Sequence, residues 1–394
     1  MLLKKDGSVW ITAIKSRGQF HSTGPSDSFV QAVSSGATAM AAGIGFSIVL
    51  KSDDSVWAAG RNYRGQLGDG TRVKRETLIY VQTITGVKAV AAGGYHSMVL
   101  TRAGYVFNTG WNKHGQFGDG TTKQRSRFRR VVSCSRVKAI AAGDLHSIVL
   151  KQDGSVWAAG RNQNGQLGDG SKTDRNIFEK VILNGAVAIA AGGYHSMVLK
   201  EDGSVWATGR NEYGELGDGT RTDRSIYAQV VLSGAKSIAA GKRHSMALKQ
   251  DGSVWATGQN ENGQLGAEWT SDIREFVQVI ADEVVAVATG AYHSMVVKQD
   301  NSIWATGSNR YGQFGDGSTI SQSSFVKLAP FAEGSRHTHK HMHLYIRAIT
   351  KACRVMFWAF SLRCILLPSL FRQLSICSQN SIVLLSQNRC AFYR

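Results

Sequence analysis

A repeat of about 49 residues runs through most of the 394-residue chain and constrains its fold more than any other feature. An aromatic residue returns at seven positions, with spacings of 47, 50, 50, 49, 49 and 49 residues. Self-similarity at periods of about 20 to 50 residues is the signature of solenoids, propellers and repeat arrays. The seven aromatic residues are Trp10, Trp57, Phe107, Trp157, Trp206, Trp255 and Trp304.

Each repeat has the pattern of four short β-strands. In the unit around Trp255 the Asp251-Gly252 pair separates two apolar runs, and Asp-Gly between such runs predicts a tight hairpin. We expect a type I′ turn there, with two residues at positive φ. The strands expected in this unit are Ser237–Ala240, His244–Lys249, Ser253–Thr257 and Phe276–Ile280.

Seven units of four strands predict an all-β fold, a seven-bladed β-propeller of four-stranded blades. The recurring tryptophan is expected to fill the space between neighbouring blades. The small Ala-Ala-Gly strand fits the narrow inner side, where backbones approach closely. The content of 44 Gly and only 3 Pro suits many tight turns between paired strands. A β-solenoid is the second interpretation, but its coils repeat at shorter periods.

The repeat resembles a known family. Its consensus runs from Ala-Gly-x-x-His-Ser through Asp-Gly-x-Val-Trp to Asn-x-x-Gly-Gln-Leu-Gly-Asp-Gly, and six Gly-Gln/Glu-Leu/Phe-Gly boxes lie between Gly65 and Gly315. This pattern is similar to the regulator of chromosome condensation repeat and covers residues 1–330. The resemblance implies a seven-bladed propeller. It also implies three roles: nucleotide exchange on a Ran-like small GTPase, chromatin binding, or an adaptor function.

The composition divides the chain into a repeat region and a tail. Residues 1–330 form the expected propeller. Closure of the ring stays open at this point: residues 331–346 contain a candidate degenerate closing strand at Gly334–Thr338, and the alternative is an incomplete first blade with an exposed edge. Residues 347–394 form a basic, cysteine-containing tail without repeats, which we expect to be poorly ordered. The formal net charge of the chain is +18. Because the repeat region itself is basic, it is compatible with acidic protein surfaces and with nucleic acid.

Five histidines precede serine at one position of the repeat: His96, His146, His195, His244 and His293. A catalytic site breaks the symmetry of a repeat, whereas these residues recur from unit to unit. We therefore interpret them, like the recurring tryptophans, as structural, each buried imidazole donating to a neighbouring carbonyl. No acid is placed to complete a triad, and the single Asp of each Leu-Gly-Asp-Gly box is too little for calcium. No Gly-rich phosphate loop is present, so we expect no cofactor, no metal and no catalytic residue.

Two loop positions vary between the repeats and are rich in Tyr and Arg. Loops on a rigid frame carry function, and both residue types are favoured at interface hot spots. We expect partner contact there, with solvated loop tips as the alternative. The candidate contact residues are Tyr63, Arg64, Tyr95, Lys113, His114, Tyr194, Tyr213, Lys242, Arg243, Tyr292, Arg310 and Tyr311.

One basic cluster interrupts the even distribution of charge, at Lys123, Arg125, Arg127, Arg129 and Arg130. The alternation of Arg125, Arg127 and Arg129 predicts that the three share one face of a strand. Such a face suits phosphates or an acidic protein. The alternative is an edge strand protected by charge against aggregation.

The sequence as a whole predicts a non-enzymatic propeller that binds a protein partner through one face. A guanine-nucleotide exchange factor and a chromatin or nucleic-acid module are the alternatives. The family's exchange factors carry an extra hairpin in one blade, for which the even spacing leaves little room. We expect a monomer in the cytoplasm or nucleus, because no signal peptide or membrane-spanning segment is evident.

Overall fold

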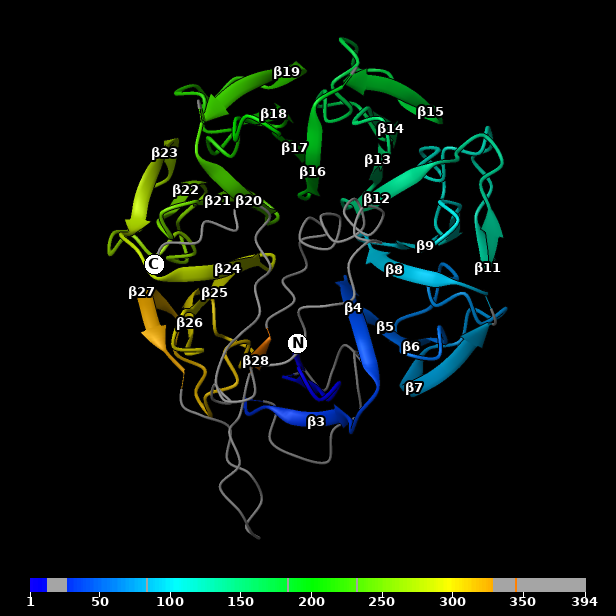
Figure 1. The fold of residues 1–394 in the computed structure, drawn as a ribbon, viewed down its shortest axis with the longest axis horizontal. Helices are drawn as coiled ribbons and strands as arrows, with labels where there is room; N and C mark the ends of the chain where they lie inside the picture. The colour runs from blue at the N-terminus through cyan, green and yellow to red at the C-terminus, as the bar shows by residue number, and fades with distance from the viewer. Residues whose placement is uncertain (13–26, 83, 183, 232, 329–343, 346–394) are drawn as a thin grey trace, which may run out of the picture.

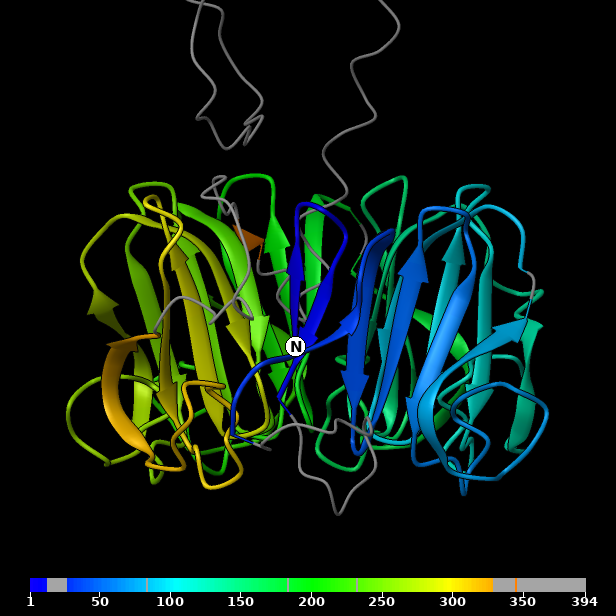
Figure 2. The ribbon, with the colours of Figure 1, turned by 90° about the horizontal axis from the view of Figure 1, so that it is seen from below.

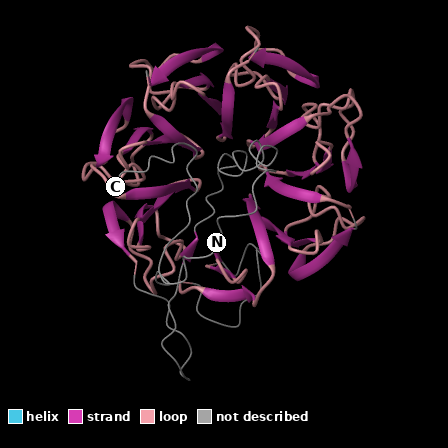
Figure 3. Ribbon diagram, in the orientation of Figure 1, coloured by secondary structure: helices cyan, strands magenta, loops and turns pink. Residues whose placement is uncertain are grey.

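The chain forms a ring of seven four-stranded antiparallel sheets, or blades, around a central axis (Figure 1). This computed structural model describes residues 1–12, 27–82, 84–182, 184–231, 233–328 and 344–345. Seen from the side, the blades stand parallel to the axis (Figure 2). The described residues contain strands and loops only (Figure 3). The seven-bladed propeller predicted from the repeat is confirmed.

The blades are numbered here in chain order, and each is given from the inner strand outward. Blade 1 contains β28 (Leu344–Tyr345), β1 (Leu2–Lys4), β2 (Val9–Ile11) and β3 (Val30–Val33). Blade 2 contains β4 (Ala37–Gly43), β5 (Phe46–Lys51), β6 (Val56–Gly60) and β7 (Arg75–Gln82). Blade 3 contains β8 (Val87–Ala92), β9 (His96–Thr101), β10 (Val106–Gly110) and β11 (Arg125–Arg130).

The remaining four blades repeat this order. Blade 4 contains β12 (Val137–Ala142), β13 (His146–Lys151), β14 (Val156–Gly160) and β15 (Arg175–Ile182). Blade 5 contains β16 (Ala186–Ala191), β17 (His195–Lys200), β18 (Val205–Gly209) and β19 (Arg224–Val231). Blade 6 contains β20 (Ala235–Ala240), β21 (His244–Lys249), β22 (Val254–Gly258) and β23 (Ile273–Ile280). Blade 7 contains β24 (Val284–Thr289), β25 (His293–Lys298), β26 (Ile303–Gly307) and β27 (Gln322–Lys327).

Blade 1 combines the start of the chain with a strand from near its end. Strand β28 pairs antiparallel with β1, so that Leu3 lies opposite Tyr345 and Lys4 opposite Leu344. The predicted closing segment Gly334–Thr338 lies outside the described residues, and so does the tail after residue 346.

The two ends of the ring carry different connections. At one end, called here the turn face, tight turns join the two middle strands of each blade. At the other end, called here the loop face, short inner connections lie beside long loops; the amide of Arg61, for example, donates to Gly45 O at 2.8 Å. The predicted type I′ turn is wrong. In the hairpin of blade 6 only Gly252 has positive φ, and its amide donates to Lys249 O at 3.1 Å, which makes a four-residue turn that ends in a left-handed glycine.

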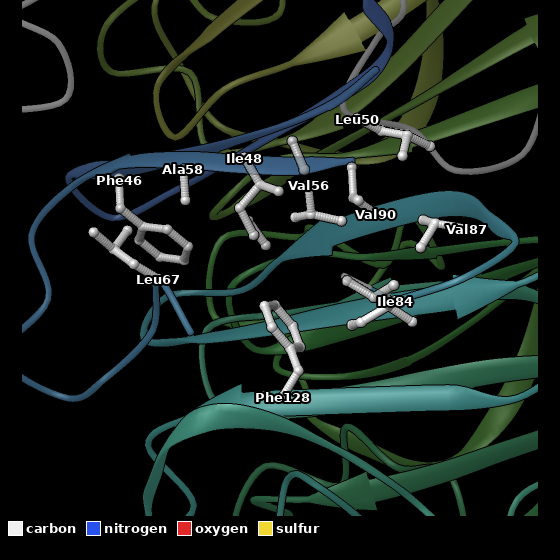
Figure 4. Close-up of a cluster of buried hydrophobic side chains, with 13 residues drawn as sticks. Phe46, Ile48, Leu50, Val56, Ala58, Leu67, Ile84, Val87, Val90 and Phe128 are labelled. Carbon is white, nitrogen blue, oxygen red and sulfur yellow. The ribbon is translucent and has the colours of Figure 1, made fainter. Parts of the chain in front are cut away.

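Side chains from adjacent blades form the core. One cluster takes Ile48, Leu50 and Val56 from blade 2 together with Val90 and Phe128 from blade 3, and all five are almost fully buried (Figure 4). Five of the six recurring tryptophans pack, half-buried, against such clusters, as Trp206 does against side chains of blades 4 and 5. Each described blade therefore depends on its neighbour for burial of its apolar faces.

Glycine is required where the inner strands end. A Cβ on Gly143 would lie 2.5 Å from Gly192 O and 2.2 Å from Cε1 of His146. These inner connections bond to one another around the axis, for example from the amide of Asp144 to Gly193 O at 3.2 Å. The close approach explains why small residues end each inner strand, as the Ala-Ala-Gly pattern predicts.

The repeated histidines connect neighbouring blades. Nε2 of His244 in blade 6 lies 3.0 Å from Oγ of Ser294 in blade 7, and that hydroxyl donates to Gln264 O at 2.7 Å. Because the serine proton goes to the carbonyl, the imidazole donates through Nε2. The acceptor is thus a serine hydroxyl, where the sequence predicted a carbonyl. Burial lowers the pKa of His244 to about 3, so the ring is neutral at pH 7.

The outer strand of blade 6 begins three residues earlier than the sequence predicted, because β23 starts at Ile273 and not at Phe276. An arginine at the start of four outer strands pairs with the aspartate of the Leu/Phe-Gly-Asp-Gly box in the same blade. In blade 4, Nε of Arg175 lies 2.7 Å from Oδ2 of Asp169. In these four blades the pair connects the start of the outer strand to the loop that precedes it. The four pairs are Arg75–Asp69, Arg125–Asp119, Arg175–Asp169 and Arg224–Asp218.

No described segment is a helix long and apolar enough to cross a membrane.

Candidate functional site

Six loops of 14 residues each form most of the described loop face: 61–74, 111–124, 161–174, 210–223, 259–272 and 308–321. A buried asparagine holds each of them. Oδ1 of Asn62 accepts from the amide of Leu67 at 3.0 Å, and its Nδ2 donates to Asp69 at 2.9 Å. The loop also packs on the next blade, since a Cβ on Gly68 would lie 2.4 Å from the ring of Phe128. The residues between these anchors are consequently presented to solvent on a rigid frame.

Aromatic and cationic side chains meet across the seam between blades 2 and 3. The guanidinium of Arg64 lies over the ring of Trp111, with 4.9 Å between its Cζ and the ring centroid. The edges of Trp111 contact Tyr95 and His114, at centroid distances of 5.5 and 5.8 Å. Nδ1 of His114 lies 2.7 Å from Oδ2 of Asp174 in blade 4. The contacts therefore extend over three blades.

A second run of such contacts crosses blades 4 to 6. Arg161 of blade 4 lies over Tyr194 at 5.4 Å, and Arg210 lies 5.2 Å from the ring centroid of Tyr213. Arg243 of blade 6 lies over Tyr213 at 4.7 Å, and its Nη1 donates to the tyrosine hydroxyl at 3.0 Å. A cation–aromatic pair contributes about 0.5 to 1 kcal/mol at an exposed site and more where it is desolvated, and these side chains are half-buried.

These side chains form the candidate site, called here the aromatic–cation belt. It consists of Arg64, Tyr95, Trp111, His114, Arg161, Tyr194, Arg210, Tyr213, Lys242, Arg243 and Tyr292, the last paired with Lys242 at 5.6 Å. Eight of the eleven are among the residues expected from the sequence to contact a partner. Whether they do so stays a prediction.

The belt also contains three residues that the sequence reasoning missed as contact candidates: Trp111, Arg161 and Arg210. All three directly precede the repeated asparagine, a position that also varies between units. Four expected residues, Tyr63, Lys113, Arg310 and Tyr311, lie on the same loops outside the belt. Tyr63 and Tyr311 are 65% and 47% exposed.

One buried carboxylate lies beneath the belt. Glu215 is 1% exposed and occupies the position where the other five described loops have glutamine. Its Oε2 accepts from the amide of Tyr213 at 2.8 Å, while its Oε1 makes no hydrogen bond and lies 4.0 Å from Nε of Arg210. Burial raises the pKa of Glu215 to about 7, against the attraction of Arg210. The carboxyl group is therefore about half protonated near neutral pH.

A second perturbed carboxylate lies near the axis on the same face. Burial raises the pKa of Asp144 to about 6, and the positive charge of Lys242 opposes the rise. Both residues sit in the inner connections of the ring. Perturbed groups concentrate at functional sites, which adds weight to the loop face as the site.

The predicted basic cluster is divided by the structure. Arg125 pairs with Asp119, and its guanidinium lies 4.4 Å from the ring centroid of Phe117, so it belongs to the repeat's own framework. Arg130 lies 3.5 Å above the ring of Tyr105, whereas Arg127 and Arg129 are exposed. Arg125 is therefore held within the fold, whereas Arg127 and Arg129 are exposed, and binding of phosphates or of an acidic protein by this cluster stays a prediction. The pairing of β10 with β11 shifts register between Asn108, opposite Arg129, and Gly110, opposite Arg125, so the alternation along β11 is interrupted there.

Within the described ranges, no three His, Cys, Asp or Glu side chains come together as a metal site. The histidines of the repeat point into the seams between blades, where Nε2 of His195 lies 2.9 Å from Oγ of Ser245. That pair is fully buried, and the serine hydroxyl donates onward to the backbone carbonyl of Glu215 at 2.6 Å. The arrangement can connect blades, and it offers no access to a substrate.

Comparison with known protein families gives two matches. The model described as RCC1-like domain matches residues 1–275, and the model of the regulator of chromosome condensation (RCC1) repeat matches residues 284–313. No curated protein matches the chain.

Solved structures share the fold at low sequence identity. Human WBSCR16 has a TM-score of 0.72 at 21% identity, covering 82% of this chain and 94% of its own. Yeast RCC1 (Prp20), solved bound to Kap60, has a TM-score of 0.68 at 21% identity and covers 75% of each chain. Prp20p from Saccharomyces cerevisiae, described together with its binding properties to Gsp1p and histones, has the same TM-score and identity, with coverage of 75% and 77%.

Proposed function

Since the chain belongs to the family of RCC1-like domains, we propose that it is a non-enzymatic scaffold that binds a protein partner through its loop face. The aromatic–cation belt is the observation that carries this proposal. Tyr, Trp and Arg are the residue types most enriched at interface hot spots, and here they are held by contacts between blades. Such preorganisation lowers the entropy lost on binding. The cytoplasm or nucleus stays the predicted compartment.

Nucleotide exchange on a Ran-like GTPase is the second candidate, because Prp20p is described with its binding to Gsp1p. The resemblance drawn from the sequence implies that exchange factors carry an extra hairpin in one blade. All six described long loops have the same length of 14 residues, and none contains such an insertion. Chromatin binding is the third candidate, supported by the net charge of +18 and by the histones named with Prp20p.

A nucleotide-release assay separates the first two candidates. We expect the full chain, at one-hundredth of the GTPase concentration, to leave the release of labelled GDP from Ran- and Rab-like GTPases unchanged. Folding of the sample is checked by its β-rich circular dichroism spectrum. Acceleration at this catalytic ratio would contradict a pure scaffold and establish an exchange factor.

A further inference from the structure

The charge of the long loops changes steadily around the loop face. The net charges of the loops in blades 2 to 7 are +3, +1, 0, −2, −3 and 0, counting Lys and Arg against Asp and Glu. Blades 2 and 3 lie across the ring from blades 5 and 6 (Figure 1). The short inner connections add Asp144 in blade 4 and Lys242 and Arg243 in blade 6. The loop face is therefore dipolar, positive at blades 2 and 3 and negative at blades 5 and 6.

The positive end is called here the basic sector, and it consists of Arg61, Arg64, Arg72, Lys74, Lys113 and Lys123. The two acids of these loops, Asp69 and Asp119, do not neutralise the basic sector, because they pair with the arginines that begin β7 and β11. Several of the cations are exposed, Arg64 and Lys113 among them. Among the described residues, Lys74 is the one cation of the sector with an ion-pair partner, Glu76 at 3.2 Å, so an anionic partner would meet a surface whose charge is mostly not neutralised within the fold.

Apolar side chains accompany the charge in this sector. Tyr63 is 65% exposed and Val73 is 59% exposed, and Trp111 of the belt, which contacts the ring of Tyr95, begins the neighbouring loop of blade 3. Phosphate groups make no apolar contacts, so exposed aliphatic and aromatic groups beside the cations would add nothing to phosphate binding. A polypeptide, in contrast, supplies both carboxylates and apolar side chains.

The acidic loops on the same face would repel a long polyanion. Glu261 and Glu268 of blade 6 have no basic residue within their own loop, and Asp272 has Arg221 of blade 5 as a partner at 3.6 Å. A nucleic-acid duplex laid across the face would bring its phosphates over these carboxylates. A short acidic segment can stay within the basic sector, since charges farther apart than about 8 Å are largely screened at physiological salt.

We infer that the basic sector binds an acidic polypeptide segment of a protein partner, with the acidic loops of blades 5 and 6 fixing its orientation. This inference rests on the proposed function, because it assumes that the loop face is the binding face. It adds the chemistry of the partner: carboxylates toward blades 2 and 3, and basic or neutral residues toward blades 5 and 6. Complementary charge of this kind acts mainly on orientation and association rate.

The test uses a fluorescein-labelled 12-residue peptide of Glu and Asp with one Leu and one Phe, measured by anisotropy with the full chain at 50 mM salt. Lys113→Glu is expected to weaken binding at least tenfold. Arg310→Glu is the matched control, because Arg310 occupies the same loop position in blade 7 and is also exposed. We expect less than a twofold change there. A labelled 12-base-pair DNA duplex is expected to bind more weakly than the peptide.

Three results would overturn the inference: no binding of the peptide, equal losses in both variants, or tighter binding of the duplex than of the peptide. The last would establish a nucleic-acid surface instead. These failures are distinguishable from failure of the proposed function. A partner that contacts the loop face while the peptide does not bind refutes only the acidic segment, whereas a partner that contacts the turn face refutes the proposed function itself.

Discussion

Glu215→Gln is expected to stabilise the propeller by about 2 to 3 kcal/mol at pH 8 and to leave its stability unchanged at pH 4.5. The unfolded chain releases the Glu215 proton near its ordinary pKa of 4.5, whereas the folded chain holds it to about 7. Between these values the folded state binds more protons, so wild-type stability falls as the pH rises. Glutamine removes this dependence, and five other described loops already accommodate it.

The measurement is the difference in urea unfolding free energy between wild type and Glu215→Gln at several pH values. Glu212→Gln is the matched control on the same loop. Its carboxylate is exposed, and its hydrogen bond with Arg210 lowers its pKa, so its replacement cannot stabilise the fold as the pH rises. A Glu215→Gln variant that is less stable than wild type at pH 8 would show that the buried carboxylate is compensated.

The effect of His244→Phe on the free energy of unfolding is expected to change sign between pH 7.5 and pH 4.5. At pH 7.5 the variant loses the bond to Ser294, which costs about 1 kcal/mol. At pH 4.5 the unfolded wild type gains a proton on His244 that the folded state, with its pKa of about 3, does not. Protonation of His244 in the unfolded state destabilises the wild-type fold by about 2.7 kcal/mol, because pH 4.5 lies two pH units below the ordinary histidine pKa of 6.5. The variant does not have this loss, so it becomes the more stable protein by about 1 to 2 kcal/mol.

Phenylalanine is the natural choice at this position, because blade 2 already has Phe46 there, fully buried and paired with Gly60 as His244 is paired with Gly258. Thermal unfolding followed by circular dichroism at pH 7.5 and 4.5 gives the comparison. A variant that stays less stable than wild type at both pH values would mean that the imidazole of His244 is protonated in the folded state at pH 4.5.

The architecture was predictable because the sequence features that produce it are repeated periodically along the chain. The aromatic spacing recurs in all seven units, the Asp-Gly turn in four and the Ala-Ala-Gly strand in five, and each reports a local requirement of the sheet. The turn type was predicted wrongly, since an Asp-Gly pair fits both a type I′ turn and a type I turn followed by a left-handed glycine. The Arg175–Asp169 pair was missed because a six-residue spacing between opposite charges indicates nothing until the loop between them is folded.

The candidate site was predictable only in part. Variable Tyr and Arg residues occur on these loops, but the contacts that join different blades of the belt connect residues about 30 to 50 positions apart, such as Arg64 with Trp111 and Arg243 with Tyr213. Burial decides the state of Glu215, and the sequence shows only that a glutamate replaces glutamine there. Both the cation–aromatic contacts of the belt and the desolvation of Glu215 thus depend on residues that are distant in the sequence, and the sequence alone does not predict them.

Site-specific photocrosslinking in cells tests the central claim most directly, because it captures whichever protein lies against the labelled position. A photoreactive residue replaces Tyr63 on the loop face in one variant and Gln152 on the turn face in another, both positions being exposed. We expect protein adducts from position 63 and none from position 152. Adducts confined to position 152 would contradict a loop-face interface and place the partner on the turn face.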